Sequence, residues 1–494
     1  MNFDNILLQN KLDEGLRLIK LNKFDKAEKI FESLKKNKQT KIIGLLYLGI
    51  IDIQKKEPHL AKKKFKRIIE IDNFNEIANL NLGLIYYEEK NYEKSIFYFN
   101  KTLSKNPNNK IAHYHKGLIN FKKKDYEKGI LDLKSCINLD KNYKYAYQVL
   151  GHIYSRIRSF DKAINVYLKA LDIDKEDYKT KFNLGKCYLS TLEFKKGFEL
   201  YEFRKRIQSN KKIDDIKQRF SVKEWCGQNL KNKTILIISE QGKGDVIQFS
   251  RYLFWLKEEF NNKIIFYVDE NMKHFFKNSP FQTVSNLNQV TKIDYYQYLL
   301  SLPGIYYFQK KSFKECVNYI DKDEFNKNLW KKKLNNYKSP LVGINWQGDP
   351  NYKNDDTRSI PLINFKKIIT IPDYNFISLQ KDFGSEQIHE NNFSKYINDF
   401  SNEFDLNKDS FKDTISIIEN LDLIITSDTS IAHLAGTLKV KTLLLLDYSP
   451  DWRWDIELNK KCFYPLIKII QQKTPGDWDS VFKVVENILI EQKY

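Results

Sequence analysis

The sequence has few cysteines and no long apolar run. Its five cysteines are far apart, odd in number and without a Cys-x-x-Cys pair, which argues against a disulfide framework and against a zinc site. No segment approaches the ~20 apolar residues of a membrane-spanning helix. The stretch Met1–Asp4 lacks the basic and apolar regions of a signal peptide. We therefore expect a cytoplasmic protein with no membrane span.

A basic tail is also missing, although the formal net charge is +20. Such a charge can attract nucleic acid, an anionic membrane or phosphorylated substrates. The lysines are instead scattered along the whole chain, which favours an evenly basic surface and no nucleic-acid partner. The length of 494 residues predicts two to four domains. The hydrophobic fraction of 41% is typical of a folded chain.

Four registers of residues recur every 34 positions through the first two hundred. One register holds Gly15, Gly49, Gly83, Gly117, Gly151 and Gly185. A second holds the small residues Ala27, Ala61, Ser95, Gly129, Ala163 and Gly197. The other two are Phe24, Pro58, Tyr92, Tyr126, Phe160 and Phe194, and Phe31, Phe65, Phe99, Leu133, Tyr167 and Tyr201. Small residues let two helices approach closely, and large ones fill the gaps between neighbouring hairpins.

This period is typical of stacked helix–turn–helix units, none of which buries its apolar face alone. It resembles the tetratricopeptide repeat, whose first helix is well matched by Asn81–Tyr86; Pro107 stands at the usual closing proline. We predict six such units over residues 1–207. The expected superhelix has a concave face that binds a peptide or a partner protein. A rigid spacer or a dimerisation platform is the alternative, and the sequence does not separate these roles.

The periodicity changes after about residue 205. Residues 208–232 are polar and basic, and we interpret them as a connector. Strand-length apolar runs then alternate with helical patterns, which predicts βαβ units and parallel sheets. The runs are 235–238, 264–268, 341–344, 376–379, 423–425 and 443–446. A lysine-rich segment divides them, so we predict two lobes, 233–335 and 336–494, with ligand sites beyond the carboxyl ends of the strands.

The first candidate site follows the run 235–238. It contains Gly242, Gly244 and Asp245, and we predict a helix from about Val246. The glycines allow a ligand to approach the backbone, although the pattern is neither the dinucleotide fingerprint nor a P-loop. Two roles are open for Asp245: an ordinary N-cap, or a general base that takes a proton from an acceptor hydroxyl.

The second candidate site follows the run 341–344. This polar loop carries Lys353 and Arg358, and either cation suits a diphosphate leaving group. The alternative is a solvated loop with local salt bridges. Three further residues near the ends of strands are candidates for lining the same cleft, namely Trp346, Gln347 and Gln380.

The third candidate site follows the run 423–425, where a hydroxyl-rich turn precedes a helix starting near Ser430. Free amides and the hydroxyls of Thr429 and Ser430 at a helix N-terminus suit an anion. Asp428 is expected to cap the helix or to accept hydrogen bonds from a sugar. His433 either reaches the phosphate or sugar or has a structural role. In the last loop, 447–454, Arg453 adds charge, and its aromatics either hold a ring or simply pack.

These motifs resemble those of the lipopolysaccharide heptosyltransferases. The stretch Ser239–Asp245 is similar to the motif that carries their catalytic base, which corresponds to Asp245. The run Ser427–Leu434 resembles the motif that holds the phosphates and sugar of their donor; its matching residues here are Asp428, Thr429, Ser430 and His433. Arg358 resembles the cation that precedes a Trp-Pro pair in those enzymes. O-linked N-acetylglucosamine transferase shares the layout of repeats followed by two lobes.

The resemblance implies two Rossmann-like lobes of the GT-B type and a glycosyltransferase. A sugar would pass from a nucleotide-diphosphate donor to a hydroxyl of a glycan, lipid or protein, with inversion, without a metal and without a cofactor. The repeats would recruit the acceptor or a partner protein. The alternative is a non-catalytic scaffold with a degenerate domain that binds nucleotide sugars.

Overall fold

The computed structural model describes residues 3–207, 216, 218–315, 318–352, 355–407, 409–455 and 463–492, with side chains from residue 8 onward. The chain divides into two compact units. One comprises Met1–Tyr154 and Asp161–Glu176, and the other comprises Ser155–Phe160 and Asp177–Tyr494.

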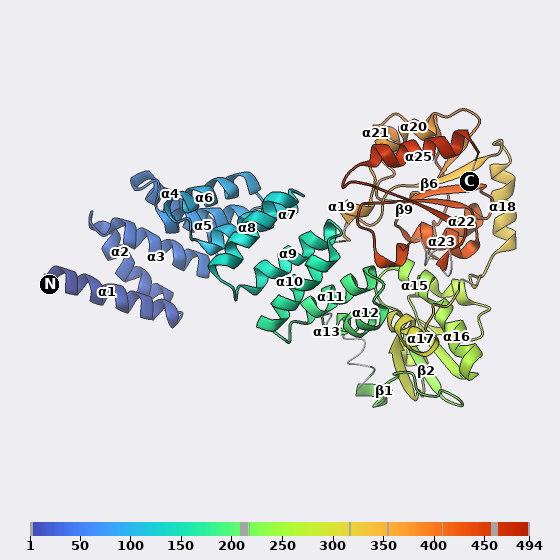
Figure 1. Cartoon of the computed structure of the whole chain (residues 1–494), viewed down its shortest axis with the longest axis horizontal. Coiled ribbons are helices and arrows are strands. Elements are labelled where there is room, and N and C mark those ends of the chain that lie inside the picture. Colours follow the sequence, from blue (N-terminus) through green and yellow to red (C-terminus); the bar gives the residue numbers. More distant parts are fainter. Residues whose placement is uncertain are drawn as a thin grey trace. The chain divides into compact units, whose positions relative to one another are not determined.

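The first unit is built from antiparallel helices (Figure 1). In chain order they are α1 (Phe3–Lys20), α2 (Phe24–Lys36), α3 (Lys41–Gln54), α4 (Pro58–Ile71), α5 (Glu76–Glu88), α6 (Tyr92–Lys105), α7 (Lys110–Lys122), α8 (Tyr126–Leu139), α9 (Lys144–Arg156) and α10 (Phe160–Ile173). A further hairpin, α11 (Tyr178–Ser190) and α12 (Phe194–Tyr201), opens the second unit.

The glycine register allows the two helices of each hairpin to approach closely, as predicted. A Cβ atom placed on Gly83 would lie 2.6 Å from the ring of Phe99, and one on Gly151 would lie 2.5 Å from the ring of Tyr167. The partners Phe99 and Tyr167 are buried members of the large-residue register. The glycine register therefore packs against the register of large residues that lies 16 positions further along the chain.

The turn inside each hairpin repeats as well. One residue in each has a positive φ, at Asn22, Lys56, Lys90, Lys124, Arg158 and Leu192. These positions are again 34 residues apart and none is glycine, so the chain accepts the left-handed conformation with ordinary side chains there.

The first sheet of the second unit is parallel, and its described strands have the order β1-β5-β2-β3-β4. Their bounds are β1 (Lys223–Glu224), β2 (Thr234–Ile238), β3 (Lys263–Tyr267), β4 (Gln282–Val284) and β5 (Tyr295–Tyr298). The helices of this lobe are α15 (Lys243–Phe249), α16 (Arg251–Phe260) and α17 (Leu302–Lys310), and α13 (Arg204–Ile207) precedes it.

The second sheet is also parallel, with the order β11-β10-β9-β6-β7-β8 among its described strands. They are β6 (Leu341–Asn345), β7 (Asn375–Ser378), β8 (Ile397–Asn398), β9 (Leu423–Ser427), β10 (Thr442–Leu446) and β11 (Ile467–Gln471). Read from β8, the chain order is 3-2-1-4-5-6, that of a doubly wound dinucleotide fold. Helices α22 (Lys412–Ile418), α23 (Ser430–Leu438) and α25 (Trp478–Ile490) belong to this lobe.

The six predicted strands are all present, as β2, β3, β6, β7, β9 and β10. Strands β1, β4, β5, β8 and β11 were not predicted. The short strands β1, β4 and β8 offer too few residues for a pattern. Strand β5 is central, but its sequence Tyr-Tyr-Gln-Tyr lacks aliphatic residues.

Two predicted boundaries need refinement. The connector 208–232 supplies β1, which pairs with β5, so part of it belongs to the first lobe. Residues 208–215 and 217 of that connector lie outside the described part of the chain. In the lysine-rich segment, α18 (Glu324–Leu334) binds the second lobe: Asn326 Nδ2 and Trp330 Nε1 donate to Asp413 Oδ1 at 2.9 and 3.1 Å.

Candidate functional site

The second sheet places a polar cluster where its winding direction reverses, between β6 and β9. Ligands of doubly wound sheets bind at this switch point. The Thr429 hydroxyl donates to Asn345 Oδ1 at 2.7 Å, and Asn345 Nδ2 donates to Gln380 Oε1 at 2.9 Å. Asn345 was not predicted as a site residue; it directly follows the predicted run 341–344 and is the last residue of β6.

Helix α23 begins directly beyond this cluster. Its N-cap, Thr429, has extended backbone angles and makes no capping hydrogen bond with its side chain. The hydroxyl of Thr429 is directed to Asn345 instead, so the amides of the first helical turn have no side-chain cap. Such a helix start carries partial positive charge and suits a phosphate group.

Helix α15 of the first lobe packs against the start of α23. A Cβ atom on Gly244 would lie 2.8 Å from His433 Cδ2 and 3.5 Å from Ser430 Oγ. Gly242 is less crowded, since a Cβ there would have only Asp245 Oδ2, at 3.6 Å, within range. Glycine at 244 is therefore what allows the two helices to meet.

Asp245 lies on α15 beside this contact. The helix begins at Lys243, three residues earlier than predicted, so Asp245 is in its first turn rather than in front of it. Its Oδ2 accepts the Gly242 amide at 3.1 Å, and its Oδ1 forms an ion pair with Arg453 of the second lobe. The carboxylate thus helps to cap its own helix and also contacts the other lobe.

Arg453 is held between carboxylates. Its Nε lies 2.9 Å from Asp451 Oδ1, and its Nη1 contacts Asp245. Burial alone would lower the pKa of Arg453, but Asp451 and Asp245 more than offset this and raise that pKa well above its usual value. The guanidinium therefore stays charged.

Asp428 and His433 both contact Trp454. The indole Nε1 donates to Asp428 Oδ1 at 2.8 Å. Burial raises the pKa of Asp428, against the opposing effects of Arg453 and this hydrogen bond. His433 stacks on the same indole with 4.8 Å between ring centroids, and its Nδ1 lies 3.2 Å from Tyr464 Oη. Burial first, then Arg453, lowers the pKa of His433 well below its usual value, so the imidazole is neutral.

The two tryptophans of the 447–454 loop are packed inside, whereas Tyr448 is half-buried. Trp452 and Trp454 are buried, which agrees with the packing alternative rather than with a ring-binding surface. Tyr464, which was not predicted as a site residue, also belongs to this cluster. Its ring packs closely on Gly436, since a Cβ atom there would lie 2.3 Å from the ring.

Arg358 is the last residue of the short helix α19 (Asp355–Arg358), in the segment that follows β6. Its Nε donates to Asp355 Oδ1 at 3.0 Å, and its guanidinium stacks 4.4 Å above the ring of Tyr352. It is close enough to Asp428 to oppose the rise that burial causes in the pKa of that carboxyl. Lys353, the other predicted cation, lies outside the described residues.

The remaining cleft candidates hold the loop in shape. Trp346 is fully buried and donates to the Gly384 carbonyl at 3.1 Å. Gln380 is also buried; its Oε1 accepts the amides of Trp346 and Gln347 at 3.2 and 3.0 Å. The side chain of Gln347 accepts from Gln387 at 2.8 Å. Trp346 and Gln380 are thus buried supports of the loop, and their side chains do not line the site.

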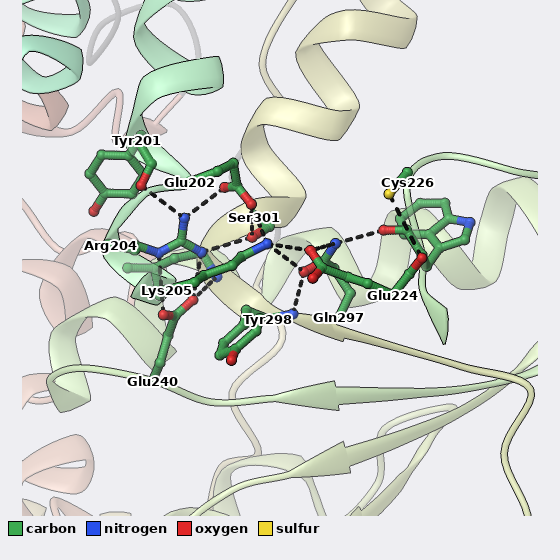
Figure 2. Close-up of polar contacts among 12 residues, drawn as sticks. Tyr201, Glu202, Arg204, Lys205, Glu224, Cys226, Glu240, Gln297, Tyr298 and Ser301 are labelled. Atoms are coloured by element: carbon green, nitrogen blue, oxygen red, sulfur yellow. Dashed lines mark hydrogen bonds and ion pairs between the residues drawn. The ribbon is translucent and has the colours of Figure 1, made fainter. Parts of the chain in front are cut away.

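The first sheet also reverses its winding direction, between β2 and β5. Side chains of the protein itself fill this switch point. Figure 2 shows Arg204, from the helix that follows the last hairpin, reaching Glu240 after β2 and Ser301 after β5. Glu202 accepts from the same guanidinium at 2.6 Å. Burial would lower the pKa of Arg204, but Glu202 and Glu240 raise it well above its usual value. This network was not predicted; the signal available was an acidic residue two positions after a buried strand.

Comparisons with known proteins identify the repeats. Tetratricopeptide-repeat family models match residues 77–109, 111–143 and 145–177. No curated protein matches the chain. Among solved structures, a fragment of MamA from Desulfovibrio magneticus is 22% identical; the match covers 34% of this chain and 98% of that one, with a TM-score of 0.32.

Two further solved structures are similar at this level. YrrB, described as a TPR protein with an unusual peptide-binding site, is 17% identical over 38% of this chain and 98% of its own, with a TM-score of 0.34. The pilF protein of Pseudomonas aeruginosa is 13% identical over 43% and 96%, with a TM-score of 0.38. The family models show that the chain carries tetratricopeptide repeats, and the strand pairing shows that an α/β region with parallel sheets follows them.

No described helix is long and apolar enough to cross a membrane. No group of three or more His, Cys, Asp or Glu side chains with metal-binding geometry occurs in the part of the chain that the structure describes.

Proposed function

We propose that the second unit is a glycosyltransferase with two lobes of the GT-B type. The observation that carries this proposal is the position of Asp245 of one lobe beside the uncapped start of α23 in the other. A carboxylate that faces an anion-binding helix terminus is the arrangement that transfer from a nucleotide-diphosphate sugar requires.

The donor diphosphate would lie at the first turn of α23, where Thr429 and Ser430 begin the helix. Arg358 and Arg453 would add two positive charges near it. These groups stabilise the charge that develops on the leaving diphosphate, a role that metal-free transfer gives to cationic side chains and amides.

The transfer would be a direct displacement. The acceptor oxygen bonds to the anomeric carbon while the bond from that carbon to the diphosphate oxygen breaks, and the electron pair leaves with the diphosphate. Asp245 takes the proton of the acceptor hydroxyl. One displacement inverts the anomeric centre. Because Arg204 and Glu240 fill the switch point of the first sheet, we expect the acceptor to enter between the lobes.

The test is the variant Asp245→Asn. Transfer or hydrolysis of a nucleotide sugar, chosen by mass spectrometry of whichever nucleotide or sugar co-purifies with the protein, should fall by about 10²- to 10⁴-fold. Binding of the donor should persist, because the amide cannot accept a proton but occupies the same space. Asp269→Asn is the matched control, since Asp269 is exposed on the same lobe and should leave turnover unchanged. Full turnover by Asp245→Asn would remove Asp245 from the mechanism.

A non-catalytic scaffold is the second candidate, and the tetratricopeptide repeats favour it. In that case the repeats bind a protein partner and the second unit binds a nucleotide sugar without turning it over. Calorimetry with a panel of nucleotide sugars, followed by a donor-hydrolysis assay, separates the two functions. Binding without turnover across glycan, lipid and protein acceptors would favour the scaffold.

A further inference from the structure

Arg453 contacts the carboxylate that the proposed mechanism needs in its free form. The carboxylate of Asp245 accepts hydrogen bonds from two donors, the Gly242 amide at Oδ2 and the Arg453 guanidinium at Oδ1. The side chains of Asp245 and Arg453 are 12% and 17% exposed, so water screens the pair only weakly. Both carboxylate oxygens of Asp245 therefore already have a hydrogen-bond donor, and the contact with Arg453 is charge-assisted.

The same guanidinium lies within electrostatic range of the donor site. Arg453 influences the pKa values of both Asp428 and His433, the residues that flank the start of α23. Its neighbour Trp454 contacts those two residues directly. A diphosphate at this helix start would therefore meet Arg453 as well as the free amides.

Arg453 thus has competing anionic partners. Asp245 belongs to the other lobe and contacts one nitrogen, whereas Asp451 belongs to the same loop and holds Nε at 2.9 Å. A diphosphate carries more negative charge than a single carboxylate and offers several oxygens to a guanidinium. Asp428 and Tyr201 also face Arg453, but the structure gives neither a hydrogen bond to it among the described residues.

We propose that Arg453 exchanges Asp245 for the diphosphate of the donor, so that donor binding releases the general base. This inference rests on the proposed function, because it assigns a regulatory role within that site. Asp451 keeps the guanidinium on its own lobe during the exchange, and Arg453 is a positioning residue for Asp245. Before the donor binds, Arg453 occupies the carboxylate of Asp245. After the donor has bound, that carboxylate is free to accept the proton of the acceptor hydroxyl.

The experiment is a double-mutant cycle on binding, which needs no turnover. Inorganic pyrophosphate, adenosine diphosphate and uridine diphosphate are titrated calorimetrically into the full chain and into Asp245→Asn, Arg453→Gln and the double variant. If Asp245 competes for Arg453, Asp245→Asn should bind these probes about five- to tenfold more tightly than the natural chain. Arg453→Gln should bind them more weakly, and adding Asp245→Asn to it should give no further gain.

The double variant decides the outcome. Removing a negative charge near an anion site tightens binding by simple Coulomb attraction even without a competition. That effect would appear equally in both backgrounds, and an equal gain would overturn the proposal. Failure of the natural chain and of Asp245→Asn to bind any probe would overturn it too. If Arg453→Gln does not fold, Arg453→Lys replaces it, and the gain from Asp245→Asn must then be smaller than in the natural background.

The cycle also separates this inference from the proposed function. A coupled gain in binding together with no sugar transfer by any variant would leave the exchange intact and remove the transferase. Transfer that depends on Asp245, together with equal gains in both backgrounds, would leave the transferase intact and remove the exchange.

Discussion

The guanidinium of Arg204 binds both carboxylate oxygens of Glu240, at 2.7 Å through Nη2 and at 3.2 Å through Nε. Both side chains are almost fully buried, with exposures of 3% and 5%. The pair ties the helix that follows the last hairpin to the carboxyl end of β2, so the final repeat hairpin and the first lobe form a continuous structure.

Arg204→Ala should destabilise the second unit by about 3–5 kcal/mol, because it leaves the buried Glu240 carboxylate without its counter-charge. All seven tryptophans lie between Trp225 and Trp478, so urea unfolding followed by tryptophan fluorescence reports on this unit alone. Arg206→Ala is the matched control, since Arg206 is exposed two residues away. A midpoint for Arg204→Ala equal to that of the control would show that the pair contributes nothing to stability.

Gly244→Ala and Gly242→Ala should differ sharply although they lie in one motif. The new Cβ at 244 would sit 2.8 Å from His433, so the helices must separate at a cost of about 1–3 kcal/mol. Alanine also favours the helix at this position, so a loss of stability there cannot be a propensity effect. Gly242→Ala meets its nearest atom at 3.6 Å and should change the unfolding free energy by less than about 0.5 kcal/mol. Equal effects in the urea assay would contradict the close contact between α15 and α23.

Arg358→Ala should weaken binding of a nucleoside diphosphate by about tenfold, because a charge-assisted contact is worth ~1.5 kcal/mol. Calorimetry with the diphosphates used above measures this directly. Arg67→Ala, an exposed arginine of the repeats, is the control for total charge. An unchanged dissociation constant for Arg358→Ala would exclude it from the donor site.

His115 should make the repeats less stable in acid. It stacks on Phe99 with 5.7 Å between centroids, and burial lowers its pKa from 6.5 to about 4. Between these values the unfolded chain binds a proton that the folded chain does not, so stability falls as the pH drops from 6.5 towards 4. His115→Gln should flatten this dependence in urea unfolding followed by circular dichroism, whereas His59→Gln, at an exposed site, should keep it. If His115→Gln loses as much stability in acid as the natural chain does, another group causes the acid sensitivity of the repeats.

The repeats could be read in detail from the sequence because their contacts are local. Gly83 and Phe99 are 16 residues apart, and the same pair of registers recurs in every hairpin, so the period itself encodes the packing. Six of the apolar strands were equally visible. Strand β5 was not, because the sheet buries Tyr296 and Gln297 in a place where the local sequence shows no aliphatic run.

The sequence also placed the polar motifs at the ends of strands, since a glycine-rich turn after an apolar run and a hydroxyl-rich turn before a helix are local signals. It could not tell which of their side chains face one another. These relationships arise only in the folded chain. Asp245 contacts Arg453, 208 residues further along the chain. Trp346 is buried beneath the loop, and Arg204 fills the first switch point. These outcomes depend on how two separately wound sheets pack together, and that packing is set by long-range burial and charge pairing, which leave no periodic trace in the sequence.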